Sequence, residues 1–164
     1  MNVRYLDIKD AELMLEWMHD LDVVSDLYTD FMSLTLEDCK KFIKESKKNQ
    51  ENLHLAIVDQ NDTYMGTVSL KHIDEDGKTA EFAITIRSCA MGKGFSKFGM
   101  TQILQIGIEK IGLKKIYWCV SKNNIRAIPF YDKNMYNRTL NVPNKILNNY
   151  DLVERPNLIW YVYE

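Results

Sequence analysis

The chain has 164 residues, of which 46% are hydrophobic and 27% are charged, and its formal net charge is −2. A single domain commonly contains about 100 to 200 residues, so we expect one domain over residues 1–164. This composition is typical of a globular protein and excludes the disordered and fibrous classes. Acidic and basic residues are interspersed without a basic stripe, which argues against nucleic acid as a partner.

Membrane and metal-binding proteins also have little support in the sequence. No apolar run approaches the roughly 20 residues that a membrane-spanning helix needs, and the residues after Met1 lack the features of a secretion signal, which predicts a cytoplasmic protein without a membrane partner. Cys39, Cys89 and Cys119 are odd in number and widely spaced, so we expect reduced thiols. The three histidines form no zinc-binding motif, and we expect no metal.

The N-terminal part of the chain predicts a strand followed by two helices. Residues 3–8 alternate between apolar and polar side chains, as in a strand. Asp10 occupies the position of a helix N-cap, ahead of apolar residues that share one helical face. After an acid-rich connection, residues 35–38 (Thr-Leu-Glu-Asp) fit the capped start of a second helix.

The middle of the chain predicts three strands and the longest helix. Residues 53–58, 64–70 and 80–87 are rich in β-branched and aromatic side chains and are separated by short polar runs, which indicates an antiparallel meander. Over residues 94–111 the apolar side chains recur every three or four positions, as in a helix. Gly112 then supplies a C-terminal stop.

The C-terminal part predicts a strand over residues 115–120, a helix over 124–135 that an asparagine opens, and a closing strand over 157–163. Residues 137–156 are expected to form a long loop around a short strand. The resulting order is β-α-α-β-β-β-α-β-α-β, without an internal repeat.

The turn between the third meander strand and the longest helix carries the clearest chemical signal. Its glycines, Gly92 and Gly94, let backbone N–H groups approach an anion, and the helix N-terminus adds about half a unit of positive charge. The turn is neither a Walker loop nor a dinucleotide fingerprint. Taken alone, a glycine pair here is as often a tight connection as an anion site.

Three segments resemble the GNAT superfamily of acyl-CoA N-acyltransferases. Residues 91–96 (MGKGFS) resemble its pyrophosphate loop R/Q-x-x-G-x-G/A, with Met91 in place of Arg or Gln and Ser96 in place of Gly or Ala. Residues 124–136 resemble its N-x-x-A-x-x-F-Y-x-K-x-G-F segment. Residues 80–86 are similar to its fourth strand, where an acidic residue precedes the positions that pair with pantetheine. The resemblance covers nearly the whole chain in the same order of elements.

This resemblance implies a mixed α/β (α+β) fold, in which helices flank a mostly antiparallel central sheet. It implies an N-acetyltransferase that moves the acetyl group of acetyl-CoA to a primary amine by direct attack in a ternary complex. The pantetheine arm would enter a slot where the fourth strand splays from the fifth. The residues that would bind acetyl-CoA are Ile84, Thr85, Ile86, Arg87, Met91, Gly92, Lys93, Gly94, Phe95, Ser96, Lys97, Asn124, Ala127 and Tyr131.

Two residues are candidates for catalysis. Tyr131 is positioned like the family tyrosine that protonates the departing thiolate, a task that suits a phenol with an ordinary pKa near 10; the alternative is a structural tyrosine in an amphipathic helix. Glu81 is a candidate base, directly or through water, and the alternative is a solvated residue at a strand edge. Cys89 and Cys119 are expected to be small buried thiols rather than nucleophiles.

The acceptor amine stays open at this stage. Tyr28, Asp30 and Phe31, in the loop between the first two helices, suit a cationic amine with an apolar or sugar-like body, although acidic loops are more commonly just solvated. The acceptors considered are a protein N-terminus, a polyamine, an aminoglycoside-like compound and an amino sugar on a nucleotide. The alternatives to acetyl transfer are a longer acyl donor and a non-catalytic domain that binds CoA or a partner.

The quaternary structure is open as well. The family often dimerises through its last strands, so Trp160, Tyr161 and Tyr163 belong either to a homodimer interface or to the core.

Overall fold

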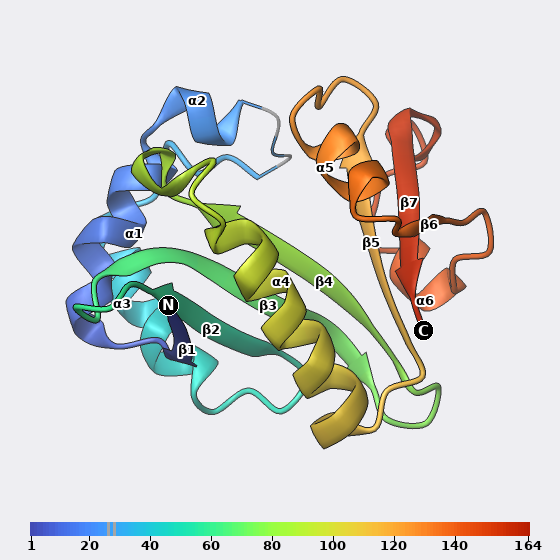
Figure 1. The fold of residues 1–164 in the computed structure, drawn as a ribbon, viewed down its shortest axis with the longest axis horizontal. Coiled ribbons are helices and arrows are strands. Elements are labelled where there is room, and N and C mark those ends of the chain that lie inside the picture. The colour runs from blue at the N-terminus through green and yellow to red at the C-terminus, as the bar shows by residue number, and fades with distance from the viewer. Residues whose placement is uncertain (26, 28) are drawn as a thin grey trace.

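A computed structural model describes residues 1–25, 27 and 29–164, and over these residues seven strands form one sheet in the order β1-β2-β3-β4-β5-β7-β6 (Figure 1). Neighbouring strands are antiparallel except β4 and β5, which are parallel. The expected mixed α/β fold with a mostly antiparallel sheet is confirmed. The strands are β1 (Asn2–Tyr5), β2 (Leu53–Val58), β3 (Tyr64–Asp74), β4 (Thr79–Ile86), β5 (Lys115–Ser121), β6 (Asn137–Arg138) and β7 (Leu158–Tyr163).

The first strand is shorter than predicted, because a 3-10 turn (Ile8–Asp10) precedes helix α1 (Ala11–Met18). Asp7 caps this turn by accepting a hydrogen bond from the N–H of Lys9 (3.1 Å). Asp10 is the N-cap residue of α1, as predicted, but its side chain makes no capping hydrogen bond to this helix. Its buried carboxylate accepts from the N–H of Asp7 (2.8 Å) and pairs with the Arg4 guanidinium (2.8 Å).

The next two helices differ in how well the sequence predicts them. The four-residue helix α2 (Leu21–Val24) is missing from the prediction, because one turn shows no periodicity. Helix α3 (Leu36–Ser46) begins as predicted, and Thr35 and Asp38 form a reciprocal capping box.

The meander is confirmed, with β2, β3 and β4 paired in antiparallel register. Strand β3 continues four residues further than predicted, and its pairing with β4 becomes irregular between Lys71 and Asp74. His72 lies in this irregular stretch with a left-handed φ of +51°. The bulge changes the direction of β3 at this point.

The longest helix runs from Phe95 to Gln105 as α4 and continues to Ile111 as a π-helical segment. The predicted helix therefore exists, but its last six residues are not α-helical. Gly112 has φ +80° and ends the helix, as predicted.

Two features of the C-terminal region correct the prediction. Helix α5 (Ala127–Lys133) begins three residues later than expected. The segment 137–156 contains β6 as the expected short strand, but it also contains the one-turn helix α6 (Asn144–Leu147), which the sequence did not predict.

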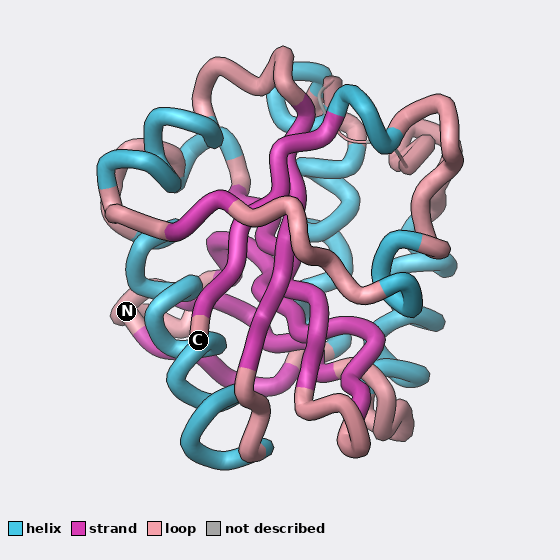
Figure 2. Tube along the Cα trace, turned by 90° about the vertical axis from the view of Figure 1, so that its right-hand side faces the viewer, coloured by secondary structure: helices cyan, strands magenta, loops and turns pink. Residues whose placement is uncertain are grey.

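The two faces of the sheet carry different helices, and Figure 2 shows helices on both sides of the strands. On β5, Ile116, Trp118 and Val120 pack in the same core as α4 and Tyr131 of α5. Tyr117, from the opposite face of β5, packs with Ile146 of α6. Helices α1 and α3 cover β2 and β3 on that opposite face, through a core that includes Met14 and Ile43.

The sheet opens between its two parallel strands. β4 and β5 pair only from Thr79 to Glu81 and from Lys115 to Tyr117. Beyond these residues the strands diverge, as Figure 1 shows, although β4 continues to Ile86 and β5 to Ser121. The slot between the fourth and fifth long strands, which the family resemblance implied, is therefore a feature of this chain.

Candidate active site

A cavity of about 750 Å³ lies where β4 and β5 diverge. Both strands line it, together with α5, the turn before α4, the segment that begins with α2, and the loop after α6. The cavity thus brings together segments that are far apart in the sequence. Its lining includes these predicted site residues: Phe31, Glu81, Ile84, Thr85, Ile86, Met91, Gly92, Ser96, Asn124, Ala127 and Tyr131.

The turn before α4 exposes a row of main-chain donors. Gly92 and Gly94 have φ values of +72° and +86°, which favour glycine, and Gly94 is the N-cap residue of α4. Within the described part of the chain, the amide groups of Gly92, Gly94 and residues 95–97 donate no hydrogen bond. Unpaired amides at the start of an 11-residue helix suit the oxygens of a pyrophosphate.

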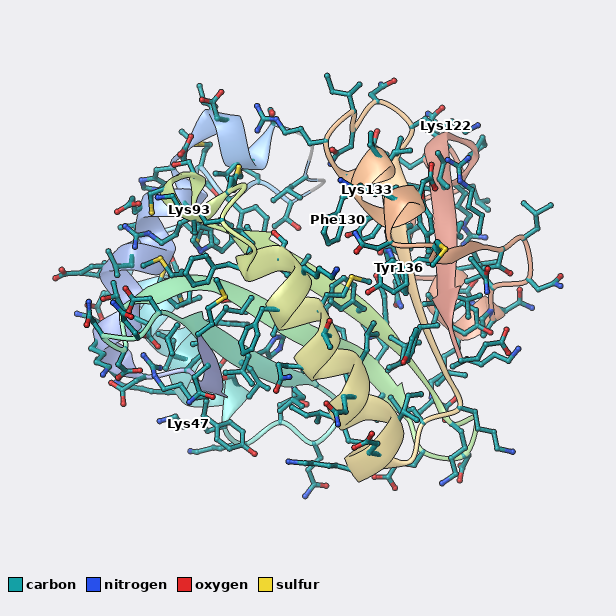
Figure 3. All side chains as sticks on the ribbon, in the orientation of Figure 1. Lys47, Lys93, Lys122, Phe130, Lys133 and Tyr136 are labelled. Carbon is teal, nitrogen blue, oxygen red and sulfur yellow. The ribbon has the colours of Figure 1, made fainter. Side chains whose placement is uncertain are left out.

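Several predicted cofactor residues do not line this cavity. The Arg87 guanidinium forms a two-oxygen ion pair with Glu16 (2.9 Å) and donates to the carbonyl of Tyr64 (3.0 Å), so its donors are engaged within the protein. Phe95 is buried in the core under α4. Lys93, Gly94 and Lys97 are exposed beside the turn. In Figure 3, Lys93 lies at this turn and Phe130 lies across the opening, on α5.

Tyr131 lies on the α4 and α5 face of the sheet, inside an aromatic cluster. Its ring centroid is 5.5 Å from that of Trp118 and 5.0 Å from that of Tyr161. Burial raises the pKa of Tyr131 above its ordinary value. The pKa of Tyr131 therefore lies above the ordinary phenol value near 10 that was expected for it. The phenol is fully protonated at neutral pH, as a hydrogen-bond donor or proton donor must be.

Glu81 lies at the last paired position of β4 and β5, opposite Tyr117. Only 2% of its surface is exposed, so the alternative of a solvated edge residue is wrong. Its Oε1 accepts a hydrogen bond from the Tyr150 hydroxyl and lies 3.7 Å from the Lys71 ammonium. Its Oε2 lies 3.8 Å from Nε2 of His72.

Glu81 and Tyr131 belong to opposite faces of the sheet. Phe82, the neighbour of Glu81 along β4, packs in the core with Tyr131, and successive side chains of a strand point to opposite faces. Both Glu81 and Tyr131 nevertheless line the one cavity, because β4 and β5 have separated there. A ligand in the opening can therefore be reached from both faces.

The start of α5 closes one rim of the cavity. Asn124 accepts hydrogen bonds from the N–H of Ala127 (2.9 Å) and of Arg126 (3.3 Å), which confirms its predicted capping role. Arg126 donates from its side chain to the carbonyl of Asp22 (2.9 Å) and so joins α5 to α2.

The cavity is lined by several carboxylates. Asp22, Asp151 and Glu154 line it in addition to Glu81. Of the predicted acceptor residues, Phe31 lines the cavity, whereas Asp30 is exposed and does not. Tyr28 lies outside the described residues. The negative charge predicted for the acceptor region is present, but different residues supply it.

A family model described as an acetyltransferase (GNAT) domain matches residues 1–134. The chain belongs to this family. It is also 24% identical over 136 residues to an uncharacterized N-acetyltransferase, p20, from Bacillus licheniformis, which covers 78% of this chain and 74% of that protein. The protein is thus an N-acetyltransferase of the GNAT type.

Solved structures show the same fold in other acetyltransferases. The spermidine N-acetyltransferase from Vibrio cholerae, in complex with CoA and spermine, has 20% identity and a TM-score of 0.76 over 84% of this chain and 81% of its own. A dodecameric structure of spermidine N-acetyltransferase from the same organism has 17% identity and a TM-score of 0.74 over 99% and 92%.

Several residues that line the cavity were not predicted as site residues from the sequence. His72 and Lys71 come from the end of β3, and Tyr150, Asp151 and Glu154 come from the loop after α6. No motif marks them. A polar residue at the end of a strand or in a long loop carries no signal until the sheet register and the path of the loop bring it to the site.

The cysteines of the acetyltransferase are all free. Cys119 lines the cavity, and burial raises the pKa of its thiol to about 11, which disfavours the nucleophilic thiolate. Cys89 is exposed, so the expectation of a buried thiol is wrong there.

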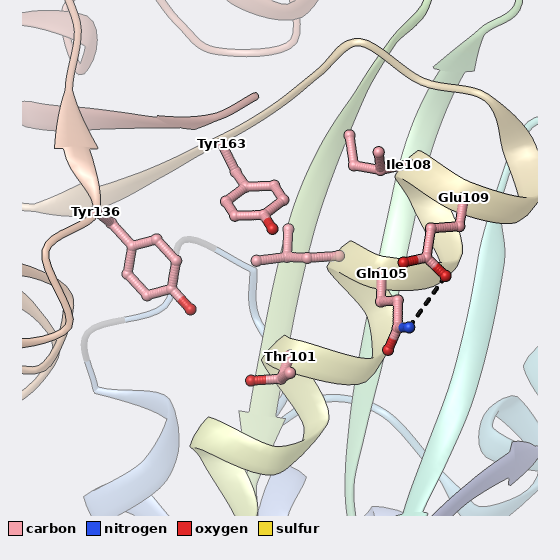
Figure 4. A pocket seen from close by; sticks show the side chains of 7 residues that line it. Thr101, Gln105, Ile108, Glu109, Tyr136 and Tyr163 are labelled. Atoms are coloured by element: carbon pink, nitrogen blue, oxygen red, sulfur yellow. Dashed lines mark hydrogen bonds between the residues drawn. The ribbon is translucent and has the colours of Figure 1, made fainter.

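A second, smaller hollow of about 260 Å³ lies between α4 with its π-helical extension and the last strands. Figure 4 shows Tyr136 and Tyr163 facing Thr101 and Gln105 across it. Gln105 donates to Glu109 (3.0 Å) along the helix. This hollow contains neither of the candidate catalytic residues.

Within residues 1–25, 27 and 29–164, no cluster of three or more His, Cys, Asp or Glu side chains could hold a metal ion. None of the helices in this part of the chain is both long and apolar enough to cross a membrane.

Proposed function

We propose that this acetyltransferase transfers the acetyl group of acetyl-CoA to a primary amine by direct attack, with donor and acceptor bound together in the cavity between β4 and β5. The observation that carries the proposal is the opening of the sheet, which joins Glu81 on one face to Tyr131 on the other. A donor that enters from the α4 and α5 face and an amine that enters from the α6 face meet at this opening.

The unpaired amides of Gly92 and Gly94 and of residues 95–97 would hold the pyrophosphate of acetyl-CoA. Beyond Glu81 the edge of β4 does not pair with β5, so its main-chain groups would bond the pantetheine arm as a neighbouring strand does. A backbone N–H of residues 84–86 would also stabilise the oxyanion that forms at the thioester carbonyl. Asn124 lines the same channel from the α5 side.

The chemistry requires three proton transfers. An alkylammonium must lose a proton before its nitrogen can attack, and Glu81 is the base that would accept this proton, directly or through water. The nitrogen then forms a bond to the thioester carbon, loses a second proton and becomes the amide nitrogen as the carbon–sulfur bond breaks. Tyr131, whose raised pKa keeps it protonated, would donate its proton to the departing sulfur and would take up the second proton of the nitrogen in return, directly or through water.

The acceptor is proposed to be a cationic primary amine. Carboxylates from Asp22, Asp151 and Glu154 line the cavity, and they favour a positively charged ligand over a neutral one. The solved spermidine N-acetyltransferase from Vibrio cholerae makes polyamines the first acceptors to test. Its likeness to this chain concerns the fold, so peptide N-termini, aminoglycosides and amino sugars stay on the same panel.

The experiment is an amine panel with acetyl-CoA, in which released CoA thiol is measured. We expect thiol release with at least one cationic amine and none without an amine. Longer acyl-CoAs added as competitors would show whether the donor site prefers acetyl.

A non-catalytic CoA-binding or partner-binding domain is the second candidate, and Met91 and Ser96 at altered positions of the pyrophosphate loop favour it. If the protein binds CoA by calorimetry but releases no thiol with any acceptor, the acetyl-transfer proposal is wrong and this candidate replaces it.

A further inference from the structure

The buried carboxylate of Glu81 has more partners than a general base alone requires. Tyr150 donates its hydroxyl hydrogen bond to Oε1, and the Lys71 ammonium lies 3.7 Å from the same oxygen. His72 approaches the other oxygen, Oε2, at 3.8 Å. The charge of Glu81 contributes in turn to the raised pKa of the Cys119 thiol on β5. These groups come from β3, β5 and the loop after α6.

The two oxygens of this carboxylate are not equivalent. Oε1 receives the Tyr150 hydrogen bond, whereas Oε2 is buried and has no hydrogen-bond partner among the described residues. A buried carboxylate oxygen without a donor is energetically unfavourable. An ammonium group in the cavity, which Glu81 lines, would supply the missing donor.

Tyr150 itself is held firmly in place. Its N–H donates to the carbonyl of Leu147 in α6 (3.0 Å), and its carbonyl accepts from Nε of Arg155 (3.0 Å). Its ring packs edge-on against Trp160 of β7, with centroids 5.3 Å apart. Burial, followed by the charges of Cys119 and Glu81, raises the pKa of Tyr150, so its hydroxyl remains a donor. The orientation of the Tyr150 O–H is thus fixed by contacts outside the cavity.

We propose that Tyr150 is a positioning residue, whose hydroxyl occupies Oε1 of Glu81 and leaves the unpaired Oε2 as the oxygen that accepts from the ammonium group. The inference rests on the proposed role of Glu81 and adds a second residue to it. In the step concerned, one N–H bond of the ammonium breaks, its proton moves to Oε2, and the electron pair stays on the nitrogen for attack. Tyr150 keeps its own proton throughout.

The test replaces Tyr150 by Phe, which retains the ring that packs on Trp160 and removes only the hydroxyl. One hydrogen bond to a charged group corresponds to a loss of about ten- to hundredfold in rate. We expect kcat to fall by that factor while the KM for acetyl-CoA stays within about twofold. Because the lost donor favoured the ionised carboxylate, the acidic limb of the kcat/KM profile should move to higher pH.

The matched control is Tyr117→Phe. Tyr117 packs in the same hydrophobic cluster on the same face of β5, and it does not line the cavity. We expect this variant to keep the parental kcat and pH profile. In a Glu81→Gln background, Tyr150→Phe should cause little further loss, because a residue that acts through Glu81 has no independent effect. An equal loss in both backgrounds would overturn the proposal.

A readout without turnover separates this inference from the proposed function. In protein labelled with ¹³C at glutamate carboxyls, the Glu81 resonance is assigned by its absence in Glu81→Gln. Tyr150→Phe should shift this resonance and its titration midpoint, whereas Tyr117→Phe should not. An unchanged resonance in Tyr150→Phe refutes the positioning role. A shifted resonance in a protein that acetylates no amine supports the contact and refutes acetyl transfer as its purpose.

Discussion

Tyr131 and Glu81 differ in how their surroundings prepare them for proton transfer. Tyr131 is enclosed by aromatic rings, and burial, followed by the charges of Tyr161, Cys119 and Tyr136, raises its pKa. Glu81 is equally buried but lies among polar groups on the other face of the sheet. The aromatic enclosure keeps one residue protonated, while hydrogen-bond and charge partners are available to the carboxylate of the other.

Replacing Tyr131 by Phe should lower kcat by about two orders of magnitude, the usual size of a general-acid contribution. The KM for acetyl-CoA should remain nearly unchanged, since the ring still fills its place beside Trp118. Steady-state thiol release measures both quantities. Tyr136→Phe is the matched control, because Tyr136 belongs to the same aromatic cluster and does not line the main cavity. A parental kcat in Tyr131→Phe would remove the phenol from the mechanism.

Replacing Glu81 by Gln preserves the size of the side chain and removes the base. We expect kcat/KM for the amine to fall by about a hundredfold at neutral pH and the acidic limb of its pH profile to disappear. The profile is measured from pH 5 to pH 10 at saturating acetyl-CoA. If the variant reproduces the parental profile, water or another group deprotonates the amine.

At the scale of single elements, the proposed pyrophosphate site depends on the start of α4. The left-handed conformation of Gly94 turns the chain into the helix, and the neighbouring amides have no partner among the described residues. Lys93, beside it, is exposed and does not line the cavity. The proposal therefore rests on main-chain geometry more than on side-chain charge.

Replacing Gly94 by Ala should weaken acetyl-CoA binding. A Cβ there meets only Met1, at 3.8 Å, so space is sufficient, and the penalty is the left-handed backbone, which costs about 1–2 kcal/mol for a residue with a side chain. We expect the dissociation constant of CoA, measured by calorimetry, to rise about tenfold. Lys93→Ala should change it by less than about threefold. A larger effect from Lys93 would reassign the anion contact to its side chain.

The capping box of α3 permits a stability prediction at the same scale. Thr35→Ala removes the side chain that accepts from the N–H of Asp38 (3.3 Å) and should cost about 1 kcal/mol. In a chain of this length the melting temperature should fall by about 2–4 °C. Thermal denaturation by circular dichroism measures it. Ser33→Ala is the control, because among the described residues the Ser33 hydroxyl bonds only the Asp30 carbonyl. This variant should melt within about 1 °C of the parent.

At the scale of the whole molecule, the aromatic residues of β7 divide between the core and the surface. Trp160 and Tyr161 are buried within the chain and belong to its core, while Tyr163 is more exposed and borders the second hollow. Of these three aromatic residues, only Tyr163 is exposed enough to contribute to a homodimer interface.

The pH dependence of global stability should reflect His54. Burial, with a smaller contribution from Lys71, lowers the pKa of His54 to about 4 from the ordinary value of 6.5. The unfolded chain therefore binds more protons than the folded one between these values, and stability rises with pH across this window. The contribution of His54 to stability is fully present above about pH 6.5 and is lost as the pH falls toward 4. Between pH 4 and pH 7 the melting temperature of His54→Asn should change less with pH than that of the parent. An equal change in both proteins would contradict this assignment.

The sequence by itself determined the order of the long elements, the glycine turn and the helix that begins near Asn124. Each of these depends on local periodicity or on the conformational freedom of glycine, which neighbouring residues along the chain already reveal. Short elements such as α2 and α6 contain too few residues for a periodic pattern, and the side chain of Asp10 pairs with Arg4 instead of capping α1.

The tertiary structure alone decided what surrounds Glu81. Its partners come from the bulged end of β3 and from the loop after α6, and the other carboxylates that line the cavity come from α2 and that same loop. Their meeting depends on sheet register and on the divergence of β4 from β5. Neither can be predicted from the spacing of residues along the chain, because long-range contacts depend on how the elements pack together.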